Sequence, residues 1–359
     1  MRVLAFPGFS NRRTNPYNYL LYSGMCAEVL EFSIARALTG RFDVLHVHWP
    51  ELELRYKPRL RAIWRLKRLF WIIDVLRSRG CKFFWTIHNL APHEPLDPSL
   101  EGKFYDALLK RIDGYFVLSE AGLEAVQLRF PALTHIPGYV TPHGHYRGVY
   151  PLDPDADVRR SLDIPSDAKV ILYFGKIKTY KNVPRLIEAF KNCEGANLIL
   201  LIAGRPLDSR IEGEIRSLAE GDPRVRLCLR HIGDTQVASY FQASDLVVLP
   251  YREVFNSGTA LLALSFDRPV VVPGVGAMAE LRDIVGSEWV NTYKGEFGEH
   301  VLISAVEWAC QASGRRCRGL DKFDWKAIAD QTLQAYKAVA SGPQSPQSRK
   351  EVGILSRRD

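Results

Sequence analysis

No hydrophobic run in this 359-residue chain approaches the roughly 20 apolar residues that a helix needs to span a bilayer. The opening residues, MRVLAFPGFS, also lack the longer apolar core and the small-residue cleavage site of a signal peptide. The six cysteines are scattered, and no Cys-x-x-Cys spacing occurs, which disfavours both a disulfide framework and a zinc module. From these absences we expect a cytoplasmic protein without a membrane-spanning helix.

Motifs that bind dinucleotides or metal-bound diphosphates are missing as well. The segment after the first strand-like run, FPGFSNRRTNPY, contains glycine but not Gly-x-Gly-x-x-Gly, so a nicotinamide-dependent oxidoreductase is disfavoured. No Asp-x-Asp follows a predicted strand. Asp153, Asp155 and Asp157 match that spacing, but they fall in a polar linker. We therefore expect no cofactor, no metal site and no dependence on a divalent cation.

Positive charge is concentrated in one segment. The formal net charge is +8, and residues 57–79 hold eight Lys or Arg against one acid, Asp74. Plotted as a helix, the segment has a cationic stripe with bulky apolar neighbours: Lys57, Arg61, Arg65 and Arg68, bordered by Leu60, Trp64 and Trp71. This pattern predicts peripheral attachment to an anionic membrane surface at the inner face of the cell membrane. The alternative is an ordinary solvated helix face.

Nucleic acid is the least favoured partner. Outside residues 57–79 the chain is nearly neutral, whereas a nucleic-acid-binding protein usually has a broader basic footprint. No segment resembles a nucleic-acid-binding module. We expect no nucleic acid partner.

Short apolar runs alternate with helix-like stretches along the whole chain. In the first half, runs such as VLHVHW (44–49) and KFFWTIH (82–88) predict buried strands, and KVILYFG (169–175) begins a second series. Helices are predicted around 20–38, 57–79, 98–111 and 120–128. Continuous apolar strands separated by helices are typical of parallel sheets covered on both faces. The predicted fold class is α/β, with two doubly wound domains.

The polar, proline-containing stretch around 145–165 marks the predicted boundary between these domains. We expect an N-terminal domain over 1–150 and a C-terminal domain over 151–320. The Ser-, Pro- and Gln-rich segment 341–359 predicts a disordered tail.

Two segments of the second domain have the composition of a diphosphate-binding site. LYFGKIKTYKN follows a strand and places Lys178 and Lys181 before a helix. In the second segment, a strand ending at Pro250 is followed by Asn256, Ser257, Gly258 and Thr259 at the start of an apolar helix. Backbone N–H groups at a helix N-terminus attract anions, and glycine permits close approach. Ordinary capping and a solvated basic turn are the alternatives.

Polar clusters follow strands of the first domain. They are His46 and His48 with Trp49-Pro50-Glu51, the segment from His88 to Glu94 that includes His93, and His143-Gly144-His145. Metal binding is conceivable from residue type alone, but the spacings match no familiar ligand set. Acid–base and sugar-binding roles are favoured, with satisfied core histidines as the alternative.

At the level of whole segments, the chain resembles GT-B glycosyltransferases, and among them the family of GDP-mannose:glycolipid β-1,4-mannosyltransferases of xanthan-type exopolysaccharide assembly. The resemblance rests on stretches that recur in order up to about residue 300. They are TNPYNYLLY (14–22), DVLHVHWPELELR (43–55), TIHNLAPHE (86–94), HGHYR (143–147), FGKIKTYK (174–181), LVVLPYREVFNSGTALLALSFDRPVVVP (246–273) and YKGEF (293–297).

This resemblance implies two Rossmann-like domains facing across a cleft, with acceptor binding in the first and nucleotide-sugar binding in the second. It also implies that a helix over 321–340 crosses back to the first domain. Many retaining relatives carry two glutamates eight residues apart, whereas this chain has Glu253 and Leu261 at those positions. In lacking the second glutamate, the chain resembles the inverting β-mannosyltransferases of this fold. The implied substrates are a nucleotide sugar and a polyprenyl-diphosphate-linked oligosaccharide.

For an inverting transfer we expect one general base and a stabilised leaving group. Glu94 is the first candidate for the base and Glu51 the second, while His88 and His93 are candidates for positioning donor or acceptor. Lys178, Lys181 and the segment 256–259 would stabilise the departing nucleoside diphosphate. The alternatives are the same reaction with a UDP-sugar donor (glucose or glucuronate), or a nucleotide-sugar epimerase.

Overall fold

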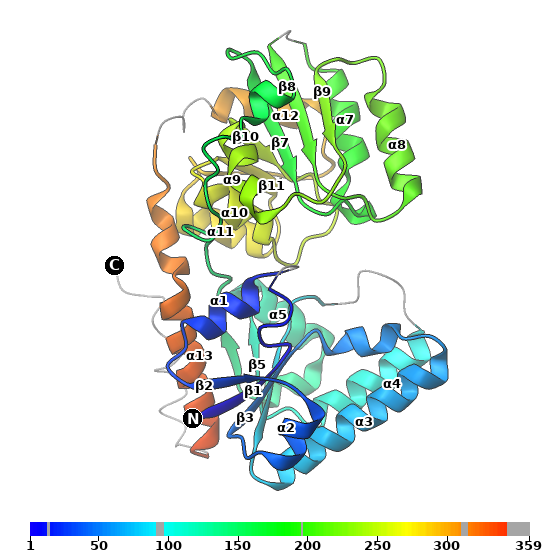
Figure 1. The fold of residues 1–359 in the computed structure, drawn as a ribbon, viewed down its shortest axis with the longest axis vertical. Coiled ribbons are helices and arrows are strands. Elements are labelled where there is room, and N and C mark those ends of the chain that lie inside the picture. Colours follow the sequence, from blue (N-terminus) through cyan, green and yellow to red (C-terminus); the bar gives the residue numbers. More distant parts are fainter. Residues whose placement is uncertain (13–14, 91–96, 195–196, 310–314, 343–359) are drawn as a thin grey trace. The chain divides into compact units, whose positions relative to one another are not determined.

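The computed structural model describes residues 1–12, 15–90, 97–194, 197–309 and 315–342, which form two compact units (Figure 1). Unit 1 comprises Met1–Gly144 and the chain from Phe323 onward, and unit 2 comprises His145–Lys322. Each unit is built on one six-stranded sheet. The predicted α/β class with two doubly wound sheets is therefore confirmed. Apart from Ser341 and Gly342, the predicted disordered tail lies outside the described residues.

The sheet of unit 1 has the order β2-β1-β3-β4-β5-β6, and every neighbouring pair is parallel. Its strands are β1 (Arg2–Phe6), β2 (Glu28–Glu31), β3 (Val44–His48), β4 (Lys82–Thr86), β5 (Gly114–Val117) and β6 (Gly138–Val140). All five residues of β3 are buried, as expected for a central strand that is covered on both faces.

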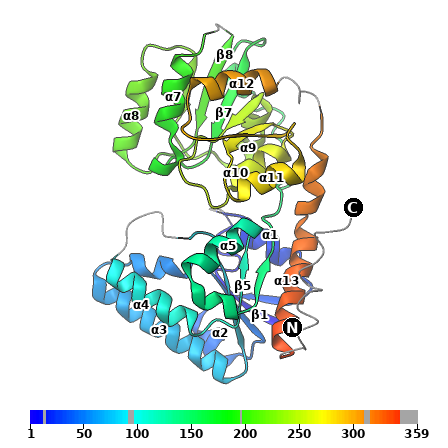
Figure 2. The same cartoon turned by 180° about the vertical axis from the view of Figure 1, so that it is seen from behind.

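Helices cover both faces of this sheet. They are α1 (Tyr17–Ser23), α2 (Ile34–Thr39), α3 (Arg59–Ser78), α4 (Pro98–Leu109), α5 (Glu120–Arg129) and α13 (Trp325–Ala340), with the 3₁₀ turns η1 (Pro50–Arg55) and η2 (Pro131–His135). In unit 1, α3 and α4 lie on one side of the sheet and α13 on the other, as seen from front and back (Figures 1 and 2).

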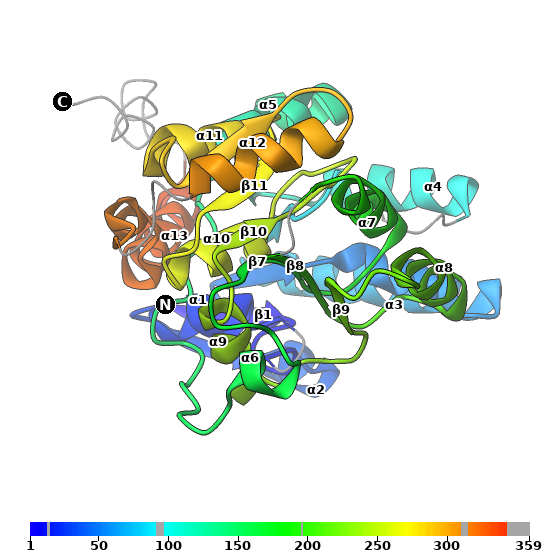
Figure 3. The same cartoon turned by 90° about the horizontal axis from the view of Figure 1, so that it is seen from above.

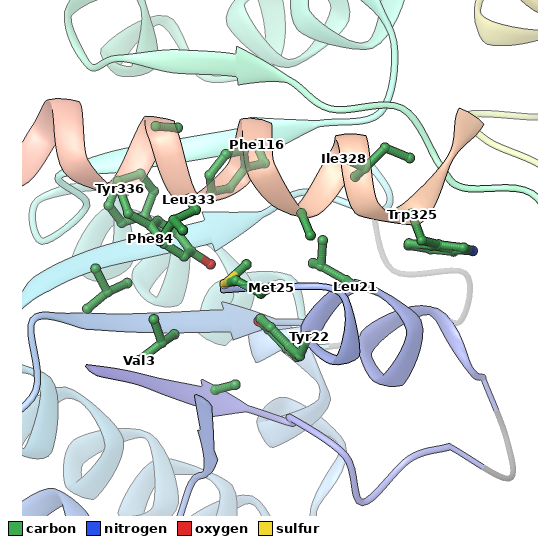
Figure 4. Close-up of a cluster of buried hydrophobic side chains, with 14 of the residues drawn as sticks. Val3, Leu21, Tyr22, Met25, Phe84, Phe116, Trp325, Ile328, Leu333 and Tyr336 are labelled. Carbon is green, nitrogen blue, oxygen red and sulfur yellow. The ribbon is translucent and has the colours of Figure 1, made fainter. Parts of the chain in front are cut away.

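The last helix, α13, packs through one apolar face. Asp324 caps it by accepting hydrogen bonds from the N–H groups of Lys326 and Ala327. Trp325, Ile328 and other buried residues of α13 share a hydrophobic cluster with residues of α1 and of strands β1, β3, β4 and β5 (Figure 4). Burial of this face fixes α13 to unit 1.

The prediction of a continuous helix over 20–38 is wrong. Helix α1 ends at Ser23, β2 follows, and Ser33 begins α2 by accepting a hydrogen bond from Arg36 N–H. Strand β2 lies at the sheet edge and is only partly buried. An edge strand therefore carries little of the continuous apolar pattern that identifies the central strands.

The sheet of unit 2 has the order β12-β11-β10-β7-β8-β9, again all parallel. Its strands are β7 (Lys169–Phe174), β8 (Leu198–Ala203), β9 (Val225–Cys228), β10 (Leu246–Val248), β11 (Val270–Pro273) and β12 (Val290–Tyr293). Its helices are α6 (Val158–Ser161), α7 (Val183–Lys191), α8 (Ser209–Ala219), α9 (Asp234–Gln242), α10 (Gly258–Ser265), α11 (Ala277–Val285) and α12 (Glu299–Ala309).

In this unit α7 and α12 lie on one side of the sheet and α9 on the other (Figure 3). The 3₁₀ turns η3 (Thr179–Lys181) and η4 (Arg318–Phe323) complete the described secondary structure. The direction of the strand order reverses between β7 and β10, which are neighbours. Open α/β sheets bind ligands at such a reversal, beyond the carboxyl ends of the strands.

Candidate functional site

In unit 2, the carboxyl end of β7 leads into a loop that only glycine can form. Gly175 follows the strand with φ of +120°, a conformation that side chains rarely adopt. The backbone oxygen of Gly175 lies so close to Gly204, after β8, that a Cβ on Gly204 would clash with it. Two neighbouring strand ends thus approach each other closely.

Lys181 and Thr259 converge on Gly175. A Cβ placed on Gly175 would lie 3.4 Å from Thr259 Oγ1 and 3.6 Å from Lys181 Nζ. These side chains come from different elements, η3 and the first turn of α10. The structure therefore brings together the two segments that the sequence identified separately.

The ammonium group of Lys181 is held in place by an aromatic neighbour. Lys181 Nζ donates a hydrogen bond of 3.2 Å to Tyr251 Oη and lies 4.9 Å from the centroid of the Tyr251 ring. Burial acts to lower the pKa of Lys181, but Tyr251 and Tyr180 outweigh it, and the pKa is raised. Lys181 thus stays cationic, as stabilisation of a diphosphate requires.

Helix α10 begins next to Lys181. Ser257 is its N-cap and accepts a hydrogen bond of 3.2 Å from Ala260 N–H, so the hydroxyl has the ordinary capping role. Gly258 and Thr259 are the first helical residues, whose N–H groups have no carbonyl partner within a helix. Asn256 directly precedes the cap, and Lys178 is the N-cap residue of η3.

Beside Lys181 and Tyr251 lies a cavity of about 510 Å³ at the carboxyl ends of β10, β11 and β12. Tyr251 and Tyr293 contribute aromatic walls, while Arg185, Arg252 and Lys294 contribute positive charge. Arg185 donates a hydrogen bond to the backbone oxygen of Phe297, and this bond fixes one side of the cavity. This volume and this mixture of aromatic and cationic groups suit part of a nucleotide sugar.

In unit 1, buried histidines form a connected polar network. His46 and His48 lie on β3 and are essentially inaccessible, and burial lowers the pKa of both imidazoles. Tyr22 Oη lies 2.7 Å from His48 Nε2 and 3.0 Å from His46 Nδ1. Tyr336 Oη of α13 bonds His46 Nδ1, and Thr86 Oγ1 lies 2.6 Å from His46 Nε2. The network therefore joins β3, β4, α1 and α13.

His88 is attached to the network at the carboxyl end of β4. Its Nε2 lies 2.9 Å from His48 Nδ1. Its ring stacks on Trp49 and meets the edge of Tyr17 at 5.0 Å. Burial keeps the pKa of His88 well below its usual range, so the imidazole is neutral. His143 also packs edge-on against Tyr17, and burial lowers its pKa to about 4.

Glu51 immediately follows β3 within η1. Its side chain is buried, and this burial raises the pKa of its carboxyl group to about 7 despite the opposing effect of Arg55. A carboxylate with a pKa near the working pH has the property expected of a general base. The other candidates of this region, His93 and Glu94, lie outside the described residues.

Possible metal ligands among the described residues are dispersed. Within the ranges that the structure describes, no group of three or more His, Cys, Asp or Glu is placed to hold a metal ion. Five cysteines in these ranges are free thiols. In the same ranges, no helix is both long enough and apolar enough to cross a bilayer.

Comparison with solved structures defines the class of fold. Sucrose-phosphate synthase from Thermosynechococcus elongatus superposes with a TM-score of 0.69 at 18% identity, covering 96% of this chain and all of that one. An α,α-trehalose-phosphate synthase from Burkholderia xenovorans superposes with a TM-score of 0.65 at 11% identity. The match covers 94% of this chain and 99% of that enzyme's chain. The fold is the GT-B glycosyltransferase fold, as predicted.

Sequence comparison adds the family. Residues 168–294 match the family model described as glycosyl transferases group 1. The GDP-mannose:glycolipid 4-β-D-mannosyltransferase of Xanthomonas campestris pv. campestris is 32% identical over 331 residues, which cover 91% of this chain and 89% of that enzyme. This chain belongs to the same family of glycosyltransferases and is an enzyme of that class.

The tyrosines of the histidine network were missed at the sequence level. Tyr17 and Tyr22 lie within the stretch TNPYNYLLY, and Tyr336 lies in the last helix, but nothing in their spacing connects them to histidines. Tyr336 and His46 are 290 residues apart in sequence. Only the packing of α13 on the sheet brings them together.

Proposed function

We propose that this enzyme transfers mannose from GDP-mannose, with inversion, to a polyprenyl-diphosphate-linked oligosaccharide in exopolysaccharide biosynthesis. The Xanthomonas relative is named for GDP-mannose and a glycolipid, which supports this donor and a lipid-linked acceptor, and its similarity extends over most of both chains. The observation that carries the proposal is the convergence of Lys181 and Thr259 on Gly175, which suits the diphosphate of a nucleotide-sugar donor.

The reaction is a single displacement. An acceptor hydroxyl attacks the anomeric carbon of the sugar on the face opposite the nucleoside diphosphate. The bond between the anomeric carbon and the phosphate oxygen breaks, and a base takes the hydroxyl proton. Lys181 and the N–H groups of Gly258 and Thr259 stabilise the negative charge that develops on the leaving diphosphate. Lys178, Asn256 and Ser257 contribute to the same binding segment.

A carboxylate of unit 1 acts as the base. Glu94 is the first candidate, because it follows β4 and His88 in the sequence, and Glu51 is the second. The raised pKa of Glu51 supports its candidacy. Replacing each by Gln distinguishes them, since the variant of the true base loses turnover while binding of GDP is retained.

His88 and His93 position the donor or the acceptor. For His88, the stacking on Trp49 and the bond to His48 support a fixed orientation of the ring. A neutral, oriented imidazole suits hydrogen bonding to a sugar or phosphate oxygen better than it suits proton abstraction.

The function is tested by incubating the purified enzyme with GDP-mannose, UDP-glucose and UDP-glucuronate, each with and without a lipid-linked oligosaccharide extract. We expect release of GDP that depends on the acceptor. Release of UDP instead would contradict the proposed donor. Conversion of the donor sugar without any acceptor would indicate an epimerase.

A membrane-facing role for α3 is the second part of the proposal. Leu60, Trp64 and Trp71 are 77%, 59% and 53% exposed and lie on one side of the helix. Large aromatic side chains are seldom left in water in this way, and tryptophan favours the boundary between lipid and water. Arg68 lies over the Trp64 ring at 4.5 Å, which places a cation beside the apolar surface.

Arg65 differs from the other members of the predicted cationic stripe. Its guanidinium forms a two-pronged ion pair with Glu53, with N–O distances of 2.6 and 3.0 Å. This pairing neutralises Arg65 within unit 1, so Lys57, Arg61 and Arg68 remain as the cations for anionic headgroups. We propose that they attach the enzyme peripherally to the cytoplasmic face of the membrane, where a polyprenyl-linked acceptor would lie.

A further inference from the structure

A second cavity of unit 2 lies between helices α7 and α8, which are neighbours (Figures 1 and 3). Its volume is about 300 Å³, at the lower end of the range for small-molecule sites. This α7–α8 cavity shares Asn182, Arg185 and Arg252 with the cavity of about 510 Å³. Of the described residues, neither Lys181 nor any part of α10 lines it, so it is separate from the candidate diphosphate site.

Asn182 lines both cavities and directly precedes α7. Only 7% of the residue is exposed, yet no described residue forms a hydrogen bond with its side-chain amide. A buried polar group without a partner destabilises the folded state. The backbone does not require asparagine either, because φ of +56° and ψ of +34° define a left-handed conformation that glycine adopts with less strain. The amide is therefore available to a ligand.

The charged groups that line the α7–α8 cavity are balanced in sign. Among the described residues they are three arginines and three acids: Arg185, Arg210, Arg252, Glu188, Asp208 and Glu214. Guanidinium groups only donate hydrogen bonds, and ionised carboxylates only accept them. A phosphate group would be attracted by the first set and repelled by the second, whereas a sugar hydroxyl both donates and accepts. This lining suits a neutral polyhydroxylated ligand better than an anion.

Some of these charged groups are fixed by the protein and others are available. Arg185 is held by its hydrogen bond to the backbone oxygen of Phe297, and Asp208 caps α8. In contrast, Arg210 and Glu214 form no ion pair with a described residue, although they lie four positions apart on α8. An unpaired cation and an unpaired anion on one helix face can bind neighbouring hydroxyl groups of one sugar ring.

We propose that the α7–α8 cavity binds a neutral sugar ring at a site separate from that of the donor diphosphate. The amide of Asn182, the guanidinium of Arg210 and the carboxylate of Glu214 form hydrogen bonds with its hydroxyl groups. A sugar chain held here stays close to the enzyme, which raises its effective concentration. Docking of the oligosaccharide acceptor in this way rests on the proposed function, whereas binding of a sugar does not.

Binding is tested by NMR in protein labelled with ¹⁵N-asparagine, where Asn182→Gly identifies the side-chain amide signal of Asn182 by its disappearance. The wild type is titrated with methyl α-mannoside and, separately, with inorganic phosphate. We expect methyl α-mannoside to shift this signal with a Kd in the millimolar range, as for other small polar ligands. The shift should persist when GDP is saturating.

Three results of this titration would overturn the proposal. The first is a signal that does not move even at sugar concentrations far above the millimolar range. The second is a response to phosphate alone, which would indicate an anion site. The third is loss of the sugar response in the presence of GDP, which would place the sugar within the donor site.

Paired substitutions in α8 test the charged residues. Arg210→Ala with Glu214→Ala removes one charge of each sign from the cavity and should weaken binding of methyl α-mannoside about tenfold, through lost hydrogen bonds to charged groups. Glu212→Ala with Arg216→Ala removes the same charges from the same helix, but these two residues pair with each other and are not among the lining residues. This control should bind the sugar as the wild type does. Equal affinities in the two double variants would overturn the assignment.

Asn182→Gly tests the amide itself. Glycine adopts the left-handed backbone of this position readily, so the variant should remain folded, which circular dichroism checks. Saturation-transfer difference signals of methyl α-mannoside should be lost. Asp163→Gly is the matched control, because Asp163 is another left-handed residue of unit 2 that lies outside the cavity. Wild-type sugar signals in Asn182→Gly would overturn the role of the amide.

Kinetics separate this proposal from the proposed function. Arg210→Ala with Glu214→Ala should raise KM for the lipid-linked oligosaccharide several-fold, with unchanged kcat and unchanged KM for GDP-mannose. An unchanged KM for the acceptor, in a variant that no longer binds methyl α-mannoside, would overturn acceptor docking. Absence of transfer in the wild type would contradict the proposed function alone, because sugar binding is measured without turnover.

Discussion

The indole of Trp49 stacks on the imidazole of His88, with ring centroids 4.1 Å apart and planes inclined by 17°. Trp49 makes this contact from a left-handed backbone conformation, with φ of +48°, which a bulky residue adopts only at a cost in energy. Strained residues of this kind cluster at functional sites, where the surrounding structure holds them. The strain at Trp49 therefore agrees with the proposed role of His88 in binding substrate.

Replacement of Glu51 by Gln should reduce kcat by about a hundredfold or more if Glu51 is the base, because Gln cannot take a proton. In the wild type, the pKa of about 7 predicts that kcat/KM falls as the pH decreases below 7. Glu53→Gln is the matched control, since Glu53 is equally buried in the same turn but is paired with Arg65. A wild-type pH profile in Glu51→Gln would exclude Glu51 as the general base, and Glu94 would remain as the candidate.

The same substitution should stabilise the protein at high pH. The pKa of Glu51 is raised from 4.5 to about 7 on folding, so the folded state retains this proton more strongly than the unfolded state. The resulting stability is present below pH 4.5 and is lost as the pH rises through 7, by roughly 3 kcal/mol in total. Urea unfolding at pH 8 should therefore give a larger free energy of unfolding for Glu51→Gln. A lower value than the wild type's would contradict the raised pKa.

Lys181→Met should weaken binding of GDP by about 10- to 100-fold, because one charge-assisted contact to the diphosphate is removed. Isothermal titration calorimetry measures this directly. Lys169→Met is the control, since Lys169 begins β7 at the opposite end of the strand. Equal losses in both variants would indicate a general electrostatic effect instead of a contact.

Gly204→Ala should destabilise unit 2 by more than about 2 kcal/mol, because the new Cβ meets the backbone of Gly175 and the φ of +154° disfavours a side chain. Gly213→Ala is the matched control within α8, where a Cβ meets nothing within 4 Å. That variant should gain about 0.5–1 kcal/mol from helix propensity. Thermal unfolding distinguishes the two variants. Similar unfolding midpoints for Gly204→Ala and Gly213→Ala would contradict the close approach of the ends of β7 and β8.

The triple variant Lys57→Gln, Arg61→Gln and Arg68→Gln should bind anionic vesicles about a hundredfold more weakly, at about 1 kcal/mol for each charge. Vesicle co-sedimentation at two salt concentrations measures the loss and its salt dependence. Activity on a soluble acceptor analogue should be unchanged.

The control removes the same charge elsewhere, through Arg216→Gln, Arg230→Gln and Arg318→Gln, all exposed in unit 2. Vesicle binding by this variant should match that of the wild type. If both triple variants lose binding equally, attraction depends on net charge and α3 has no specific role.

Chelation of divalent cations should leave transfer unchanged, since in the proposed mechanism Lys181 and the N-terminus of α10 stabilise the leaving group without a metal. GDP release is measured in the presence of a chelator. Loss of activity that only one divalent ion restores would contradict this expectation.

The fold class, and the position of the two candidate donor segments after strands of the second sheet, could be predicted from the sequence alone. Continuous apolar strands such as those around His46 and Tyr173 identified parallel sheets, because a strand buried on both faces needs apolar residues at nearly every position. Lys181 and Ser257 each follow such a strand, β7 and β10, as the sequence predicted. The carboxyl ends of parallel strands meet at one edge of the sheet.

Which side chains contact one another became known only from the packed structure. The bond from Tyr336 to His46 spans 290 residues, and that from His48 to His88 depends on the register of β3 beside β4. The pairing of Arg65 with Glu53 likewise could not be read from the helical stripe. Periodicity reports whether a position faces core or solvent, whereas hydrogen bonds and ion pairs require distances that only the packed chain defines.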